Sequence, residues 1–329
     1  MPISERPSYF LIAVSTPENL ELCIRYGLAG FPSGESGVWT YCEIREGDFL
    51  SFLYGAKAHN LYTVTKKEAI LDAEHLPPWK LLEFKASEKR YSFPFRLQLE
   101  PVRVFVESLV RAEFSYVAEN LLLRGGYSKS HFQADQTTLQ SVSEMGKLAD
   151  NPPVHLEFPP HTTFEPRFTK NRESLRTPAV MRFKETILQS AIRQHLSNER
   201  NLKRLCIALG LQIVATDFEV LGEKALPQGH VDILLKQRTP IGSAAKIPIE
   251  VKTNEAKEKD LEQIRGYMDE LRGECPTGVL LAAGFGKRVL SRVTSSGVRL
   301  LRYELNVDLK KAPTFEEICR GLILESIPK

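Results

Sequence analysis

The sequence predicts a protein of two folded domains, an α+β domain built on a strongly curved sheet followed by an α/β domain. Its 329 residues are enough for two domains that each bury an apolar core. Prolines interrupt a stretch without apolar periodicity between Asn151 and Pro166. We therefore expect an amino-terminal domain over residues 1–148, a proline-rich basic linker over 149–175 and a carboxy-terminal domain over 176–329.

Short strands interleaved with helices are predicted for the amino-terminal domain. Residues 9–14 are a predicted strand, and residues 17–26 are a predicted helix with Ser15 or Thr16 as its cap. Further strands are predicted at residues 49–54, 61–64 and 93–99. This pattern indicates an α+β barrel.

In the carboxy-terminal domain, residues 246–252 alternate between apolar and polar side chains. Successive side chains of a strand point to opposite faces, so Glu250 and Lys252 project together from one face. Residues 231–235 form a second apolar strand with a single acid, Asp232. The two carboxylates could share one divalent cation, Mg²⁺ or Mn²⁺, because these ions prefer hard oxygen ligands. Such an ion can activate a water for attack on a phosphate, and the lysine can orient that water or neutralise the developing charge.

The segments that follow predict the order strand, strand, helix, strand, helix, strand. Apolar residues recur at helical spacing over residues 255–271, where Gln263 and Tyr267 lie four residues apart on an adjoining face. The unbroken apolar run at 277–283 predicts a buried central strand, and residues 298–303 predict a strand nearer an edge.

With these residues in this order, the chain resembles the PD-(D/E)XK nuclease superfamily, and within it the carboxy-terminal domain of the NucS (EndoMS) type. The resemblance covers roughly residues 180–305 and implies a restriction-endonuclease-like α/β fold that hydrolyses phosphodiester bonds. The catalytic residues that it implies are Asp232, Glu250, Lys252, Gln263 and Glu185. The metal ligands that it implies are Asp232, Glu250 and, on a preceding helix, Glu185, with Glu199 as a weaker candidate for the last.

Pro248 departs from the superfamily's pattern because it lies inside the predicted catalytic strand. Proline removes one ladder hydrogen bond, which predicts an edge or bulged position for this part of the strand.

Both tryptophans of the chain lie in the amino-terminal domain, in loop-like contexts rich in Gly or Pro: Ser36-Gly37-Val38-Trp39 and Pro77-Pro78-Trp79. With residues 47–50 and 127–133, these segments resemble the PUA-like group that includes EVE and YTH domains, over about 130 residues. The resemblance implies a pocket for a modified base turned out of its strand, since an indole face stacks well on a base. The pocket residues that it implies are Trp39, Trp79, Tyr127, Phe93 and Ser36. Each tryptophan has ordinary core packing as its alternative, and His131 is expected to be a packed or capping residue.

Composition narrows the class of protein further. The net charge is only +3, so any nucleic-acid surface must be local. The five cysteines show no CxxC spacing, which argues against structural zinc and against a disulfide framework. Short apolar runs and the lack of a signal peptide predict no membrane partner and a cytoplasmic location. Residues 167–184 carry six basic residues and one acid, a pattern as typical of a phosphate-binding segment as of a solvated linker.

Together these features predict a modification-dependent DNA endonuclease of host defence, whose partner is a methylated or otherwise modified duplex. Cleavage of both strands with one metal site per chain favours a homodimer. Two alternatives stay open: a NucS-like repair endonuclease for mismatched or branched DNA, and a non-catalytic reader of modified nucleic acid. The complete set of Asp232, Glu250 and Lys252 argues against the non-catalytic reader.

Overall fold

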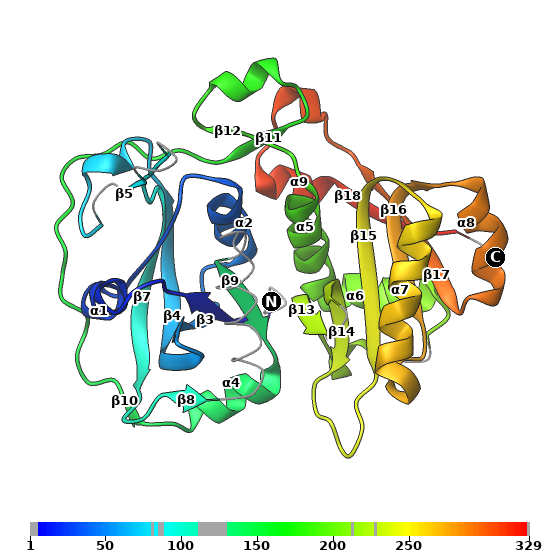
Figure 1. The fold of residues 1–329 in the computed structure, drawn as a ribbon, viewed down its shortest axis with the longest axis horizontal. Helices are drawn as coiled ribbons and strands as arrows, with labels where there is room; N and C mark the ends of the chain where they lie inside the picture. The colour runs from blue at the N-terminus through cyan, green and yellow to red at the C-terminus, as the bar shows by residue number, and fades with distance from the viewer. Residues whose placement is uncertain are drawn as a thin grey trace. The chain divides into compact units, whose positions relative to one another are not determined.

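The computed structural model describes residues 6–79, 82–84, 89–110, 130–211, 214–226 and 229–327. The chain divides into two compact units (Figure 1). The amino-terminal unit comprises Pro7–Pro166 and Thr177–Ala179, and the carboxy-terminal unit comprises Met1–Arg6, Arg167–Arg176 and Val180–Lys329. The carboxy-terminal unit therefore takes up Arg167–Arg176, which lie mostly inside the segment predicted as a linker. Over the described ranges, no helix is both long and apolar enough to cross a membrane.

The amino-terminal unit mixes helices with a sheet of strand order β10-β7-β4-β3-β1-β9, in which β2 also pairs with β7 and β8 with β4. Only the β1–β3 pair is parallel among the pairs of this sheet in the described residues. The strands of the sheet are β1 (Tyr9–Ala13), β2 (Leu28–Phe31), β3 (Phe49–Tyr54), β4 (Lys57–Ala69), β7 (Phe95–Val104), β8 (Leu109–Val110), β9 (His131–Ala134) and β10 (Lys147–Leu148). A separate hairpin consists of β5 (Leu82–Phe84) and β6 (Lys89–Tyr91). The helices are α1 (Pro17–Tyr26), α2 (Glu35–Glu43), α4 (Gln136–Ser143) and the short η1 (Ala73–His75).

Helix α1 begins and ends where the sequence predicts. The hydroxyl of Thr16, not that of Ser15, accepts a hydrogen bond from the backbone N–H of Asn19 at 3.2 Å. Pro17 occupies the first turn, where its missing N–H costs nothing. Gly27 ends the helix with a φ of 57°, in the left-handed region that glycine adopts without strain.

The indole of Trp79 belongs to the core of the amino-terminal unit. Trp79 is only 7 % exposed, and the Arg96 guanidinium lies 5.5 Å from its ring centroid. Gly30 packs directly on the ring, because a Cβ at Gly30 would lie 2.5 Å from ring atom Cζ3. Arg96 is itself buried and donates hydrogen bonds to the carbonyl oxygens of Leu76, Pro77 and Phe93, which fixes the turn that carries Trp79.

The carboxy-terminal unit is an α/β structure built on a sheet of strand order β13-β14-β15-β16-β17-β18. Its strands are β13 (Phe218–Leu226), β14 (Gly229–Gln237), β15 (Lys246–Ala256), β16 (Gly278–Phe285), β17 (Val298–Leu305) and β18 (Leu322–Ser326), with a separate pair β11 (Arg167–Thr169) and β12 (Val180–Arg182). Its α-helices are α5 (Glu185–Ser197), α6 (Glu199–Ala208), α7 (Glu258–Leu271), α8 (Lys287–Arg292) and α9 (Phe315–Gly321). Its short 3-10 helices are η2 (Glu173–Arg176), η3 (Ala215–Asp217), η4 (Arg272–Glu274), η5 (Val293–Ser295) and η6 (Leu309–Lys311). The predicted order of strands and helices from β14 to β17 is confirmed.

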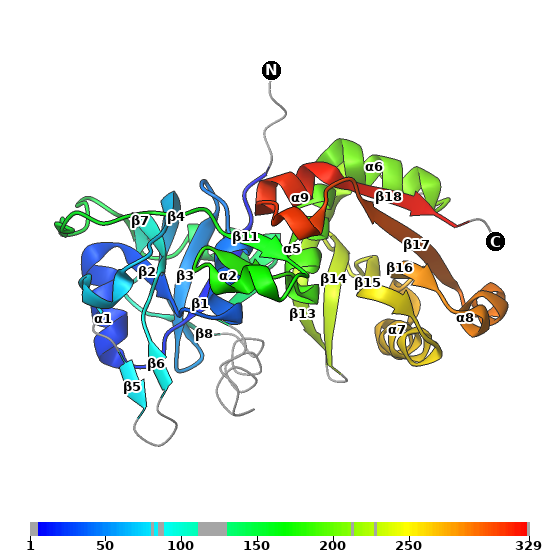
Figure 2. The ribbon, with the colours of Figure 1, turned by 90° about the horizontal axis from the view of Figure 1, so that it is seen from above.

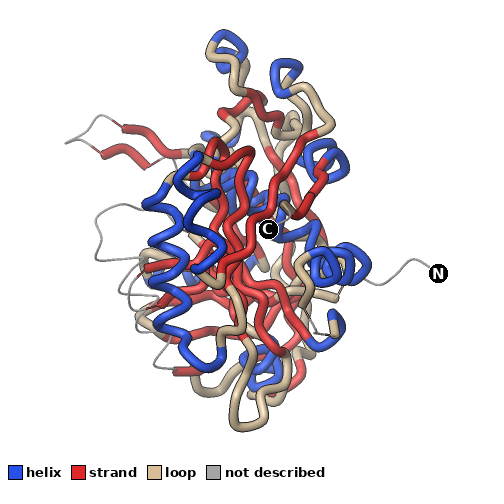
Figure 3. Tube along the Cα trace, turned by 90° about the vertical axis from the view of Figure 1, so that its right-hand side faces the viewer, coloured by secondary structure: helices blue, strands red, loops and turns tan. Residues whose placement is uncertain are grey.

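Helices cover both faces of this sheet. Figure 2 shows α5, α6 and α9 on one side of the strands and α7 and α8 on the other, and Figure 3 distinguishes strands from helices by colour. On the side of α7, apolar residues from both the helix and the strands form one buried cluster that includes Leu261, Ile264, Leu280, Ala282 and Leu300. The prediction that residues 277–283 form a buried central strand is confirmed, because β16 lies between β15 and β17.

The edge or bulged position predicted for Pro248 is wrong. Strand β15 lies inside the sheet, where it pairs antiparallel with β14 and parallel with β16. The backbone N–H of Val251 points toward β14, so the nitrogen of Pro248, three residues earlier, points toward the opposite neighbour. Pairing with β16 starts only at Ile249, beside Val279, so no ladder bond is lost at Pro248. The irregularity of β15 falls later, between Lys252 and Glu255.

We expect Gly30→Ala to destabilise the amino-terminal unit by about 1–3 kcal/mol, because the new methyl group overlaps the Trp79 ring and forces the packed core to shift. Urea unfolding measures the change. Gly34→Ala is the control, since its added Cβ meets nothing within 4 Å. Equal stability of the two variants would show that Trp79 is not held against Gly30.

Candidate active site

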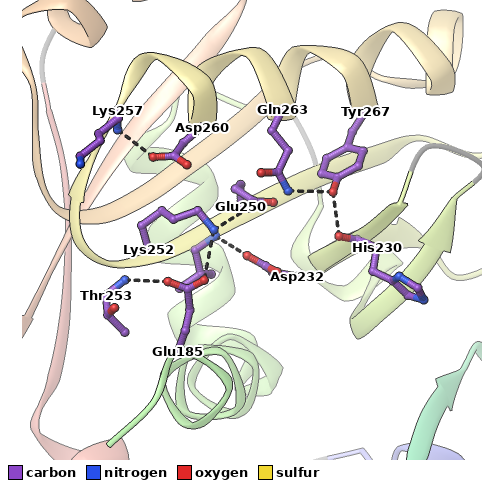
Figure 4. A network of polar contacts seen from close by, with 11 residues as sticks. Glu185, His230, Asp232, Glu250, Lys252, Thr253, Lys257, Asp260, Gln263 and Tyr267 are labelled. Atoms are coloured by element: carbon purple, nitrogen blue, oxygen red, sulfur yellow. Dashed lines mark hydrogen bonds and ion pairs between the residues drawn. The ribbon is translucent and has the colours of Figure 1, made fainter. Parts of the chain in front are cut away.

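Four ionisable side chains from three elements converge in the carboxy-terminal unit (Figure 4). Asp232 comes from β14, Glu250 and Lys252 from β15, and Glu185 is the first residue of α5. The Lys252 ammonium lies 2.7 Å from Glu250 Oε1 and 3.1 Å from Glu185 Oε1. The alternation in the sequence correctly predicts that Glu250 and Lys252 share a face, and their register neighbours Leu280 and Ala282 place that face toward α7.

The site opens where two strands of the sheet diverge. Backbone pairing between β14 and β15 stops at Ile233 and Ile249. One residue beyond, the Asp232 carboxylate takes the place of a backbone acceptor, because its Oδ2 accepts the N–H of Val251 at 2.7 Å. The divergence thus aims the Asp232 carboxylate at the strand that carries Glu250.

The amino-terminal end of α5 is tied to the same strand. Glu185 Oε2 accepts the backbone N–H of Thr253 at 3.1 Å, while Oε1 faces Lys252. The Tyr303 hydroxyl on β17 donates to the Thr253 carbonyl oxygen at 2.8 Å, which holds β15 where its pairing becomes irregular. Glu185 therefore reaches the site through Lys252 and the β15 backbone. Glu199, its weaker alternative, begins α6 and is exposed.

Burial sets the protonation of the two strand acids. Glu250 is 1 % exposed, and desolvation raises its pKa to about 7 although Lys252 acts in the opposite direction. The pKa of Asp232 is raised as well, first by desolvation and then by the charge of Glu250. Burial alone would lower the pKa of Lys252, but Glu250, Asp232 and Glu185 raise it, so the ammonium stays charged.

A divalent cation would need carboxylate oxygens that are not already occupied by hydrogen bonds or ion pairs. Glu250 Oε2 is buried and has no hydrogen-bond partner, whereas Oε1 is held by Lys252. An unpartnered, buried carboxylate oxygen is costly unless a cation or proton occupies its lone pairs. Within the described ranges, no three His, Cys, Asp or Glu side chains gather into a complete metal cluster. Two carboxylates still suit Mg²⁺, because this ion commonly binds one or two protein carboxylates and keeps its other positions for water and phosphate.

A chain of hydrogen bonds links α7 to the start of β14. Gln263 Nε2 donates to the Tyr267 hydroxyl at 2.9 Å, and that hydroxyl donates to the His230 carbonyl oxygen at 2.8 Å. Tyr267 is buried, whereas Gln263 is exposed. The spacing of Gln263 and Tyr267 predicts their shared face, and the structure adds that they anchor the strand carrying Asp232.

Sequence reasoning missed Asp260 and Tyr303. Asp260 is buried at the third position of α7, where it accepts the Lys257 N–H at 2.7 Å, and its charge contributes to the raised pKa of Glu250. An acid three residues into a helix is a capping signal that the sequence does contain. Nothing local marks Tyr303, because its partner Thr253 lies 50 residues earlier.

The predicted base-pocket residues have different surroundings in the amino-terminal unit. Trp39 lies within α2, so the loop context predicted for it is wrong; the ring is 3 % exposed and packs edge-on against His131 at 4.8 Å between centroids. His131 is packed, as predicted, with Nδ1 2.8 Å from the Thr40 hydroxyl. Trp79 follows a turn and is also buried, and the centroids of the Trp79 and Phe93 rings lie 5.6 Å apart. Ser36 is half-buried in the first turn of α2, and Tyr127 lies outside the described residues.

Comparison with known proteins gives only weak similarities. No protein-family model matches the sequence, and no curated protein matches it. A solved complex of EndoMS with double-stranded DNA is 22 % identical over 25 % of this chain and 35 % of that chain, with a TM-score of 0.22. A repair endonuclease from Pyrococcus abyssi is 18 % identical over 31 % of this chain and 45 % of that chain, with a TM-score of 0.23. The DNA modification-dependent restriction endonuclease AspBHI is 13 % identical over 96 % of this chain and 80 % of that chain, with a TM-score of 0.22.

These neighbours are DNA endonucleases, but the chain spans less than half the length of the first two. Similarities with TM-scores this low do not indicate what this chain does.

We expect Glu250→Gln to stabilise the fold at neutral pH by about 1–3 kcal/mol. The pKa of Glu250 is about 7 in the folded state and near 4.5 when unfolded, so the folded chain keeps a proton that the unfolded chain has released between these pH values. Raising the pH through this window therefore destabilises the parent, and the glutamine variant lacks this loss. Unfolding in urea at pH 5, 6, 7 and 8 measures it, with the exposed Glu262→Gln on α7 as control. Parallel pH profiles for the parent and Glu250→Gln would contradict the burial argument.

Proposed function

We propose that this chain is a metal-dependent DNA endonuclease. The observation that carries the proposal is the convergence of Asp232, Glu250 and Lys252 where β14 and β15 diverge, with a buried Glu250 oxygen left without a partner. A site that serves only stability would not retain two desolvated acids with raised pKa values, because an apolar pair of similar volume is commonly as stable or more so.

Each residue has a defined task in this proposal. Asp232 and Glu250 would hold Mg²⁺ or Mn²⁺, which supplies a more acidic bound water and neutralises charge on the scissile phosphate. The Asp232 carboxylate is oriented by the Val251 N–H, and Glu250 by the Lys252 ammonium. Glu250 must lose its proton before it can bind a cation, so cation affinity should rise with pH toward and above 7.

The Lys252 ammonium remains charged around neutral pH, because the carboxylates beside it raise its pKa. This ammonium can donate to a phosphate oxygen or to the attacking water while Glu250 and Glu185 hold its position. Glu185 would position this ammonium, and it is also proposed as a third ligand when a cation is bound. Gln263, exposed on α7 and held by Tyr267, is proposed to contact the substrate.

Removing either strand acid should abolish cleavage. We expect Asp232→Asn and Glu250→Gln to lower the cleavage rate of duplex DNA more than about 100-fold, and Lys252→Met by about 10²- to 10³-fold through loss of transition-state charge stabilisation. Glu262→Gln, a change of charge on the exposed face of α7, should cleave like the parent. Gel assays with Mg²⁺, Mn²⁺ or excess chelator measure these rates. Full activity in chelator, or in either acid variant, would overturn the proposal.

The finer proposal concerns which DNA is cut. We propose that the amino-terminal unit selects a modified base, which makes the protein a modification-dependent restriction endonuclease, and that two chains act together to cut both strands. The burial of Trp39 and Trp79 means that any pocket formed by their rings requires these side chains to leave their present packing. The alternative is a repair endonuclease for mismatched or branched DNA.

A panel of duplexes distinguishes these substrates. We expect plasmids with N6-methyladenine, 5-methylcytosine or hydroxymethylcytosine to include one that is cut at least about 10-fold faster than unmodified plasmid, since one lost stacking contact is worth about 1–3 kcal/mol. Mismatched and branched duplexes without modification complete the panel. Preference for these over every modified plasmid would favour the repair enzyme. Binding of modified DNA without cleavage under any metal would favour a non-catalytic reader.

A further inference from the structure

Two segments about 140 residues apart form one surface on the carboxy-terminal unit. The Thr169 hydroxyl of β11 donates to the Leu309 carbonyl oxygen of η6 at 2.7 Å. The backbone N–H of Phe168 donates to the Pro313 carbonyl oxygen at 2.8 Å, and Arg167 Nε donates to the Ala312 carbonyl oxygen at 2.7 Å. We call the surface formed by residues 167–184, without Thr177–Ala179 of the amino-terminal unit, and by residues 308–311 the β11–η6 surface.

The β11–η6 surface is strongly basic. Its two segments carry eight basic residues and two acids, Glu173 and Asp308, in a chain whose net charge is only +3. Asp308 caps η6, where its Oδ1 accepts the Lys310 N–H at 2.9 Å. Six of the basic side chains are exposed and make no ion pair within the part of the chain that the structure describes: Lys170, Arg172, Arg176, Arg182, Lys310 and Lys311. An unbalanced group of fixed cations attracts a polyanion.

This surface leads directly into the candidate active site. The backbone N–H of Phe183 donates to the Thr169 carbonyl oxygen at 2.8 Å, and the Lys170 ammonium lies 5.8 Å from the centroid of the Phe183 ring. Two residues later, Glu185 contacts Lys252. The α-carbons of Arg182 and Glu185 are at most about 11 Å apart, which corresponds to at most about three nucleotides of one strand measured along the DNA axis.

We propose that the β11–η6 surface binds the phosphates of the DNA strand beside the scissile bond and so sets the position of the duplex over the site. This inference rests on the proposed nuclease function and deepens it. From sequence alone, residues 167–184 could equally be a phosphate-binding segment or a solvated linker. In the structure, β11 pairs with β12, and β11 is hydrogen-bonded to the chain around η6. The cations on these segments are therefore presented by a folded surface at a fixed place relative to Glu185.

The test compares two triple variants with the same loss of charge. The surface variant combines Arg172→Gln, Lys310→Gln and Lys311→Gln, which removes cations from both segments. The control variant combines Arg200→Gln, Lys203→Gln and Arg204→Gln, three exposed basic residues of α6 in the same unit. All six side chains are exposed, and circular dichroism with thermal unfolding verifies that each variant folds.

Duplex binding is measured without metal at several salt concentrations. Each lost phosphate contact should lower the slope of log Kd against log salt by about 0.9, so the surface variant should lose about 2–3 from the slope and bind about 10-fold or more weakly near 0.1 M salt. Its KM for cleavage should rise while kcat stays close to that of the parent. The control variant should keep the slope of the parent. Equal slopes and affinities in both triple variants would overturn the inference while leaving a cleaving parent, and hence the proposed function, intact.

A second measurement locates the contacts. Neutral methylphosphonate linkages placed singly along a duplex that is cut at one site should weaken binding of the parent at positions about three nucleotides from the scissile bond. The same substitutions should weaken binding less in the surface variant, which has already lost three of the six exposed cations of the surface, than in the parent. Equal interference for both proteins, or interference only at distant positions, would assign the phosphate contacts to another surface. A parent that neither binds nor cuts any duplex would overturn the nuclease function itself.

Discussion

The buried ion pair between Lys252 and Glu250 is the interaction on which the candidate site depends. Glu250 is buried and Asp232 half-buried on adjacent strands, and the charge of Glu250 adds to the desolvation that raises the pKa of Asp232. Lys252 lies two residues from Glu250 on the same strand face and supplies a positive charge at 2.7 Å. Lys252 lowers the pKa of both acids, so without its ammonium both pKa values would be higher and the charged, metal-binding form of each carboxylate would be less favoured at neutral pH. The pair therefore stabilises the charges that the proposed chemistry needs.

Around this ion pair, one carboxylate oxygen, Glu250 Oε2, has no hydrogen-bond partner. Strand pairing ends at Ile249, and beyond it Asp232 contacts β15 through its side chain only. The Tyr303 hydroxyl holds Thr253 where the register of β15 shifts, and Glu185 takes the Thr253 N–H. These contacts satisfy the polar backbone groups that the divergence exposes. Glu250 Oε2 is left without a hydrogen-bond partner, and it is the oxygen that a cation would bind in the proposed function.

Much of the carboxy-terminal fold could be predicted from sequence because it follows from local periodicity. Alternation in β15 correctly places Glu250 and Lys252 on one face, and the apolar run of β16 correctly predicts a central strand. The effect of Pro248 on its strand could not be predicted in the same way. Whether a proline disrupts a sheet depends on the direction of its nitrogen and on where pairing with the neighbouring strand starts. Trp39 shows the same limit: its Gly-containing context predicts a loop, whereas its helix packs against His131, 92 residues away. Local patterns do not encode such distant contacts.

The most direct test of the account is the location of a bound cation. Crystals of the full chain grown with Mn²⁺ would show it by anomalous scattering at the manganese edge. The account predicts one peak per chain, within about 2.0–2.3 Å of an oxygen of Asp232 and of Glu250 Oε2, and no peak at that place in Glu250→Gln. A peak elsewhere in the carboxy-terminal unit, or none in crystals of protein that cleaves DNA in Mn²⁺, would contradict the claim that these two carboxylates form the metal site.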